Sequence, residues 1–246
     1  MQITVLGGCG AWPTAGAACS GFLVEYEGFR ILLDAGYATL PQLLKVIAAA
    51  QVDAVLISHG HPDHCADLNP LLRARALSAD PPPALPVFAP IAALNAVLAL
   101  DRPGMLDDAL VLNEFAPGST LSVGPFTVTT RLLPHWVPNA GMRLEAGGAA
   151  VAYTGDCGPD PAVPALASGA DLLIAEATYV EHVPTEDSRH LTSALQAAEQ
   201  AARADVGRLM LTHLWPGTEP DTATAAARRA YNGRIDVAQG GLRIGL

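Results

Sequence analysis

The chain has 246 residues, half of them apolar and 15% charged, and its formal net charge is −10. This length and apolar content are enough to bury a sizeable core, which excludes an intrinsically disordered protein. The charge is spread along the sequence without a basic run, which argues against a long nucleic acid as partner, because neutralising many phosphates needs clustered Lys and Arg.

The cysteines and the apolar segments bear on the compartment. No two cysteines have the Cys-x-x-Cys spacing, so we expect reduced, partly buried thiols at Cys9, Cys19, Cys65 and Cys157. No basic segment precedes an apolar one at the start, and no apolar run reaches about 18 residues. We therefore expect a cytoplasmic protein without a membrane partner.

The first third of the chain predicts strands in quick succession. A strand at 3–6 precedes the glycine-rich segment 7–10. Strands at 21–26 and 29–33 flank a turn at Glu27-Gly28, which predicts a hairpin.

A helix, a buried strand and a second helix are expected next. Thr39-Leu40-Pro41-Gln42 resembles a capping box with Pro in the first turn, so we expect a helix from Thr39 to about Ala50. The apolar run 52–58 has the length of a strand buried on both faces, and 67–77 has helical spacing.

The rest of the chain alternates between the two kinds of element. We expect strands at 86–89, 120–123, 126–133, 142–145, 149–154, 171–175 and 207–212. We expect helices at 91–100, 192–204 and 222–231, the second of them with a capping box at Ser193 to Gln196. Two similar halves of this kind favour a layered α/β architecture within one domain, residues 1–246, in which two helical layers cover a pair of sheets. Periodicity alone does not separate it from a doubly wound sheet.

Four side chains that bind metals follow the buried strand 52–58 closely, in His59-Gly60-His61-Pro62-Asp63-His64. Because Gly60 and Pro62 suit an irregular loop, we expect a loop here and not a helical site of the HExxH type. On a loop, the first two histidines can point to one side, while the aspartate and the last histidine reach a second point nearby. This arrangement suits two metal ions rather than one.

Three further candidate ligands come directly after predicted strands, where a rigid scaffold can aim a side chain. They are His135, Asp156 and His213. Each by itself could be structural, but together with the motif they complete a set of nitrogen and oxygen ligands without a thiolate. Such a set suits two divalent ions, Zn²⁺ first and Mn²⁺ or Fe as alternatives.

In this order and across nearly the whole chain, these residues match the metal motifs of the metallo-β-lactamase superfamily, which the sequence resembles. The resemblance implies an α/β fold of the αββα type, a four-layer sandwich. It also implies that the two ions are held by His59, His61 and His135 and by Asp63, His64 and His213, with Asp156 bridging both. Asp34 matches an aspartate with which that family supports a metal ligand; the alternative is a turn-forming Asp before Gly36.

Two further motifs resemble the ribonuclease Z-like branch of that superfamily. Segment 174–178 is similar to its His-Glu-Ala-Thr motif, with Ala175 in place of the His, and His190-Leu191-Thr192 is similar to its His-x-Thr motif. The resemblance implies that His190 protonates the leaving-group oxygen and that Glu176 orients this histidine. The structural alternatives are a charge that ends a strand and a polar residue before a helix cap. His182 is expected to be a surface histidine.

The implied reaction is hydrolysis of a phosphodiester. A hydroxide that bridges the metals would attack phosphorus, with Asp63 helping to position or deprotonate the water, and a dedicated acid suits a poor leaving group. Ribonuclease Z enzymes that process tRNA carry a long arm before the bridging aspartate, whereas only twenty residues separate His135 from Asp156. The opening segment 7–13 also resembles compact members such as cyclic-nucleotide phosphodiesterases. We therefore expect a small phosphodiester as substrate, such as a 3′,5′-cyclic nucleotide, and not tRNA.

Three alternatives remain open: a thioester or lactone hydrolase of the same fold, an arm-less ribonuclease Z-like RNA-processing enzyme, and a non-enzymatic metal-binding protein. An acyl leaving group has less need of the Glu176–His190 pair, so this pair is the discriminating feature. Trp12, Trp136 and Trp215 are expected in the core or at the rim of the pocket, with base stacking as the alternative. The branch often forms dimers, which makes the chain a candidate homodimer.

Overall fold

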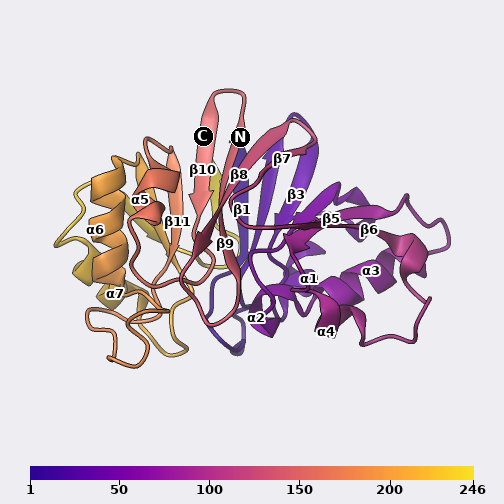
Figure 1. The fold of residues 1–246 in the computed structure, drawn as a ribbon, viewed down its shortest axis with the longest axis horizontal. Helices are drawn as coiled ribbons and strands as arrows, with labels where there is room; N and C mark the ends of the chain where they lie inside the picture. The colour runs from indigo at the N-terminus through magenta and orange to yellow at the C-terminus, as the bar shows by residue number, and fades with distance from the viewer.

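Two seven-stranded mixed sheets pack face to face in the computed structural model, which describes residues 1–246 (Figure 1). The strand order is β14-β1-β2-β3-β4-β5-β6 in the first sheet and β13-β12-β11-β10-β9-β8-β7 in the second. Each sheet comes from one half of the chain, except that β14 returns to pair with β1. The two chain ends therefore lie side by side, and the Met1 amino group donates to the Leu246 carbonyl at 3.0 Å.

The strands have the following bounds. The first sheet contains β1 (Gln2–Gly7), β2 (Gly21–Tyr26), β3 (Phe29–Leu33), β4 (Ala54–Leu56), β5 (Leu85–Pro90), β6 (Leu110–Phe115) and β14 (Arg243–Gly245). The second sheet contains β7 (Thr120–Val123), β8 (Phe126–Leu133), β9 (Asn139–Ala146), β10 (Ala149–Tyr153), β11 (Leu172–Glu176), β12 (Arg208–Thr212) and β13 (Arg234–Val237).

Helices cover the outer faces of both sheets. The helices of the first half are α1 (Thr39–Leu43), α2 (Pro62–Cys65), α3 (Leu68–Ala76) and α4 (Asn95–Leu98). Those of the second half are α5 (Ala162–Ala167), α6 (Ala194–Ala204) and α7 (Pro220–Ala227). Figure 1 shows α3 and α4 beside the first sheet and α5 to α7 on the far side of the second. The predicted αββα layering is confirmed.

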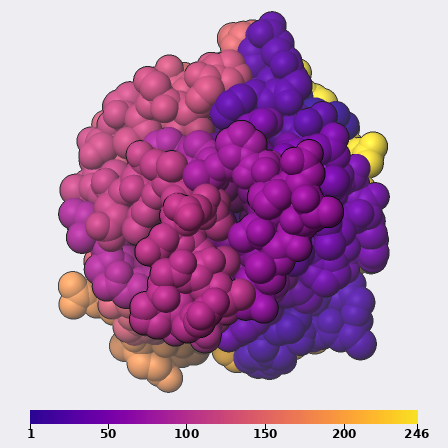
Figure 2. Space-filling model, turned by 90° about the vertical axis from the view of Figure 1, so that its right-hand side faces the viewer, coloured from indigo at the N-terminus to yellow at the C-terminus, as the bar shows by residue number.

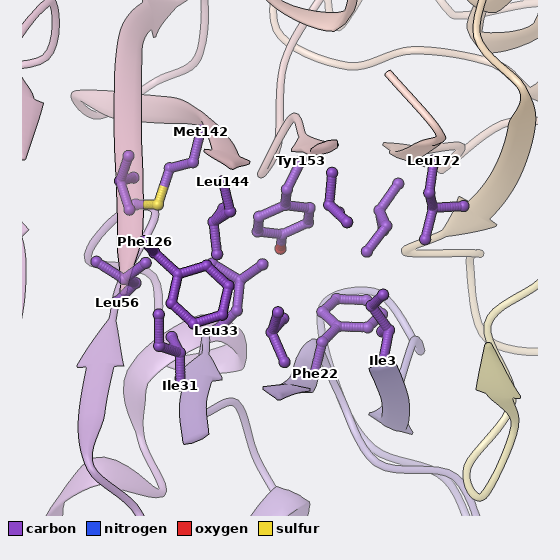
Figure 3. Close-up of a cluster of buried hydrophobic side chains, with 14 of the residues drawn as sticks. Ile3, Phe22, Ile31, Leu33, Leu56, Phe126, Met142, Leu144, Tyr153 and Leu172 are labelled. Carbon is purple, nitrogen blue, oxygen red and sulfur yellow. The ribbon is translucent and has the colours of Figure 1, made fainter. Parts of the chain in front are cut away.

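Three apolar layers hold these four layers of secondary structure together. Between the sheets, large side chains such as Phe22, Leu33, Phe126 and Tyr153 interlock (Figure 3). Because successive side chains of a strand point to opposite faces, Val151 and Tyr153 of β10 enter this central layer, whereas Ala150 and Ala152 belong to the outer layer under the helices. In that outer layer the alanines of α6 pack on β11 and β12.

The hairpin of β2 and β3 and the capping box at Ser193 are confirmed; the Ser193 hydroxyl accepts the Gln196 N–H at 3.2 Å. The helix predicted from Thr39 to Ala50 is wrong in extent, because α1 ends at Leu43 and only a 3₁₀ turn follows at Ala49–Gln51. Thr39 is not its cap. The carboxylate of Asp67, which is distant in sequence, accepts the N–H of Leu40 at 2.8 Å.

The helix predicted at 91–100 is also wrong in extent. Ala92 has a φ of 61°, in the left-handed region, so helical geometry begins only at α4. Five elements are missing from the sequence prediction, namely β6, α2, α5, β13 and β14. The three strands among them are edge strands, and their pairing partners define them more than their own apolar pattern does.

Seen from the side of α3 and α4, the surface is formed mainly by indigo-to-magenta segments, and orange and yellow residues reach only its margin (Figure 2). No helix in the structure combines the length and apolar character needed to span a bilayer.

Strands β3 to β6 run parallel to one another, as do β10 to β13. Their carboxyl ends are the usual place for a binding site in an α/β sheet.

Candidate metal centre

All seven predicted ligands come together at the carboxyl ends of these strands. His135, Asp156 and His213 follow β8, β10 and β12, which run in the same direction within the second sheet. The motif beginning at His59 follows β4 of the first sheet. The site is thus assembled from both sheets, and each sheet contributes its rigid strand ends.

The expectation that the whole motif lies on a loop is wrong in its second half. His61 has extended backbone angles and caps α2, in which Pro62 occupies the first turn and Asp63 and His64 follow. The turn places these two side chains in the second group of ligands, beside those of the first two histidines. Gly60 is required before it, because a Cβ there would lie 2.5 Å from the Ala93 carbonyl oxygen.

The first group of candidate ligands consists of His59, His61, His135 and Asp156, called here the open cluster. His61 Nδ1 lies 3.1 Å from His59 Nε2 and 3.1 Å from His135 Nε2. Asp156 Oδ2 lies 3.8 Å from the Nε2 atoms of His59 and His135. Ligands placed tetrahedrally at about 2.0–2.2 Å from one metal ion are roughly 3.3 Å apart, which matches this group.

The second group consists of Asp63, His64, His213 and Asp156, called here the buried cluster because all four are buried. His213 Nε2 lies 3.1 Å from Asp63 Oδ2 and 3.2 Å from Asp156 Oδ2. His64 Nε2 lies 3.2 Å from Asp156 Oδ1. Asp156 therefore belongs to both clusters, as the resemblance implied.

Two orphaned atoms test whether cations fit here. His64 Nε2 and Asp156 Oδ1 are buried and have no hydrogen-bond partner, which costs free energy unless a ligand takes the place of the partner. The other ring nitrogens are occupied: His64 Nδ1 faces Asp34 at 2.7 Å, and His135 Nδ1 faces the His190 carbonyl at 3.0 Å. The Nε2 atoms of His64 and His135 are thus left to face the clusters, as metal ligation requires. The residues fit divalent cations.

The clusters differ in their electrostatics. Burial lowers the pKa of His59, His61 and His135, the last to about 4, so the open cluster favours neutral imidazoles. Burial acts in the same direction on His64 and His213, but the carboxylates of Asp156 and Asp63 outweigh it and raise the pKa of both. Without a cation, the buried cluster holds protons instead.

Asp34 supports a metal-ligand histidine, His64, as the resemblance implied. It is fully buried and has a φ of 56°, a strained conformation for a residue other than Gly. Its Oδ2 accepts from His64 Nδ1, Ser58 Oγ and Tyr153 Oη, each at 2.7 Å. Ser58 Oγ also lies 3.0 Å from His59 Nδ1. Sequence reasoning missed Ser58 and Tyr153, for which no local signal exists.

The resemblance implied that Glu176 orients His190, but no hydrogen bond joins the two side chains. Glu176 Oε2 accepts from the N–H and the hydroxyl of Thr178, and Oε1 accepts from the Thr192 N–H at 2.7 Å. Burial and the nearby Asp156 carboxylate raise the pKa of Glu176 to about 8, and a cation bound at Asp156 would act against the second cause. His190 instead packs against Trp136, with ring centroids 5.0 Å apart and the ring planes tilted by 33°, and its buried Nδ1 has no hydrogen-bond partner.

A cavity of about 440 Å³ lies over the clusters. Besides metal-site residues its wall contains Trp136, Tyr179, Asp187 and Trp215, and no Lys or Arg. Trp136 and Trp215 are about half exposed, so they form a rim and not a core. Trp12 meets Trp215 edge to face, with ring centroids 5.0 Å apart.

Comparison with known proteins agrees with this geometry. Residues 29–214 match the family described as the beta-lactamase superfamily domain. The chain is 31% identical to YhfI of Bacillus subtilis, described as a probable metallo-hydrolase, over 98% of each chain. The crystal structure of YhfI superposes with a TM-score of 0.90 at 30% identity and covers 99% of each chain. A ribonuclease Z of Mycolicibacterium gilvum is 31% identical, over 96% of this chain and 93% of that enzyme.

Proposed function

Because this chain belongs to the β-lactamase superfamily and is a metallo-hydrolase, we propose that it is a dinuclear phosphodiesterase for a small phosphodiester, such as a 3′,5′-cyclic nucleotide. The observation that carries the proposal is the sharing of Asp156 by two four-ligand clusters. When bound there, two divalent ions, Zn²⁺ by the ligand chemistry, would supply Lewis acidity to the phosphoryl group and an acidified water.

The chain's own residues set the charge and the shape of the site. Asp63 Oδ2 accepts the Ala11 N–H at 3.0 Å, which fixes the carboxylate beside His213 for a role in positioning water. The cavity wall offers no cationic side chain for additional phosphates, and Asp187 adds a negative charge. These features favour a singly charged phosphodiester over a polyanion such as tRNA.

His190 is proposed as the general acid. It directly precedes Leu191 and packs against Trp136. Leu191 and Trp136 line the cavity. A protonated imidazole at this place would donate to the departing alkoxide of a ribose-type leaving group. No carboxylate is hydrogen-bonded to the His190 ring, so we propose that the contact with Trp136 orients this imidazole.

The experiment compares leaving groups in His190→Ala. Removing a general acid costs about 10²–10⁴-fold in rate where the leaving group is poor, so we expect that loss in kcat on 3′,5′-cyclic AMP. On bis(p-nitrophenyl) phosphate, whose leaving group needs little protonation, we expect a much smaller loss. His182→Ala, at an exposed histidine, is the matched control. An equal loss on both substrates would overturn the role of His190.

A thioester or lactone hydrolase is the second candidate, because the Glu176–His190 pair that the resemblance implies for phosphodiesterases is not hydrogen-bonded here. Assaying the metal-loaded enzyme on cyclic AMP, a tRNA precursor, a lactone and a thioester separates the candidates. We expect cyclic AMP to have the highest kcat/KM. Faster hydrolysis of the lactone or thioester would replace the phosphodiesterase proposal.

A further inference from the structure

Thr178 links a carboxylate to a metal-ligand histidine in the second sheet. Its Oγ1 donates to Glu176 Oε2 at 3.0 Å and lies 2.9 Å from His213 Nδ1. All three side chains are buried, so water does not compete for these bonds. Because the hydroxyl hydrogen is directed to the carboxylate, Oγ1 must accept from a protonated Nδ1. With a cation bound, His213 would then present an unprotonated Nε2 to the buried cluster.

The first sheet contains the same arrangement. Ser58 Oγ donates to Asp34 Oδ2 at 2.7 Å and lies 3.0 Å from His59 Nδ1, so this imidazole presents Nε2 to the open cluster. Each cluster is thus served by one relay from a carboxylate through a hydroxyl to an imidazole. The recurrence in two unrelated segments indicates that the Glu176 relay is a feature of the metal site and not incidental packing.

Glu176 has a second connection. Its other oxygen accepts the Thr192 N–H at 2.7 Å, and the Thr192 hydroxyl donates to the Cys157 carbonyl, next to Asp156, at 2.6 Å. The same carboxylate therefore touches the relay to His213 and the segment that carries His190. A group between two such elements can fix their relative position.

We infer that Glu176 is a positioning residue of the buried cluster: through Thr178 it fixes the tautomer of His213, and through Thr192 it anchors the segment of His190. This role differs from direct orientation of the His190 ring. The inference rests on metal binding at the clusters, which is part of the proposed function, and not on the identity of the substrate.

The decisive variant is Thr178→Val, which removes the hydroxyl at nearly constant volume and leaves the Glu176–Thr192 bond in place. Loss of such an outer partner costs about 10–100-fold in metal affinity, so Zn²⁺ titration of the metal-free protein should show this loss in one of two binding steps. Thr178→Ser should restore it. Thr212→Val is the matched control, since Thr212 is an equally buried threonine whose hydroxyl has no partner.

A measurement on the unmodified chain avoids any folding defect of the variant. In zinc-loaded protein, ¹⁵N NMR should show His213 protonated at Nδ1. Zn²⁺ affinities equal to wild type in Thr178→Val, or the same loss in Thr212→Val, would overturn the relay, as would an Nε2-protonated His213. A wild-type chain that binds no Zn²⁺ would instead overturn the metal assignment of the proposed function.

Glu176→Gln tests the second connection. The amide would place its NH₂ group against a donor, either the Thr192 N–H or the Thr178 N–H. We expect weaker Zn²⁺ binding together with faster hydrogen exchange at the Thr192 amide. Lower turnover with unchanged Zn²⁺ affinity and exchange would show that Glu176 acts on His190 alone, which contradicts the inference.

Discussion

The open and buried clusters share the carboxylate of Asp156 but differ in their other three ligands. In the open cluster three imidazoles surround Asp156, and two of them, His61 and His135, are only partly buried. In the buried cluster a second carboxylate replaces one imidazole, and every ligand is shielded from solvent. The cavity is lined by ligands of both clusters. The clusters therefore differ in their charge and not in their access to the cavity.

The electrostatic difference follows from this composition. An extra carboxylate in a buried place stabilises positive charge, so the buried cluster retains protons when it has no cation. The open cluster has less negative charge and keeps its imidazoles neutral. Two sites a few ångströms apart can thus respond differently to pH and to the loss of a supporting residue.

The largest expected effect comes from the ligand that the clusters have in common. Asp156→Ala should lower the metal content of both clusters and reduce kcat/KM by more than the ~100-fold upper range of an outer-shell change. Metal analysis and turnover of bis(p-nitrophenyl) phosphate would measure it, with Asp80→Ala, at an exposed carboxylate, as the control. Retention of one tightly bound ion at the open cluster would show that Asp156 is not shared.

An intermediate effect is expected where support reaches the clusters unequally. In Asp34→Asn the amide cannot accept all the donors that face Asp34, so the buried cluster should lose about 10–100-fold in Zn²⁺ affinity through His64, and the open cluster should be weakened as well, through Ser58. Ser58→Ala breaks only the relay to His59 and should weaken the open cluster alone. Zn²⁺ titration with a competing chelator distinguishes the steps. If Ser58→Ala also weakened the buried cluster, the direct contact of Asp34 with His64 would not be a separate support.

The smallest expected effect is a difference in proton release. The carboxylates of Asp156 and Asp63 raise the pKa of His64 and His213 and so favour the protonated imidazoles in the metal-free protein, and Zn²⁺ must displace these protons. Affinity at the buried cluster should then rise with pH until these raised pKa values are passed, by about tenfold per unit for each proton released. His135, with a pKa of about 4, is already neutral, so affinity at the open cluster should be flat above about pH 5. Calorimetry in two buffers of different ionisation enthalpy would count the protons, and equal counts for both steps would contradict the comparison.

The ligands could be found in the sequence because their signal is local. The motif at His59–His64 lies within one short segment, and His135, Asp156 and His213 each follow a recognisable strand. The supporting residues have no such signal. The partner of Tyr153 lies 119 residues away along the chain. Thr178 belongs to the motif-like segment 174–178, but its partner His213 lies 35 residues away, so the motif by itself does not mark this contact.

The secondary structure shows the same limit. The hairpin at β2 and β3 was predictable because its turn and its strands are adjacent in the chain. The helix after Thr39 was predicted too long, since α1 ends at Leu43, and the Leu40 N–H finds its acceptor in Asp67, in another segment. The orientation of His190 by Glu176 also depends on contacts between remote segments. In the structure the Glu176 carboxylate accepts from Thr178 and Thr192 instead.

The sequence by itself determined the layered α/β class, the kinds of ligand and their places at strand ends, because side-chain chemistry and strand periodicity are local properties. Only the tertiary structure decided which ligands meet around Asp156 and which carboxylate supports which histidine. Hydrogen bonds and metal ligation act over about 3 Å, and such distances between remote segments exist only once the two sheets have packed.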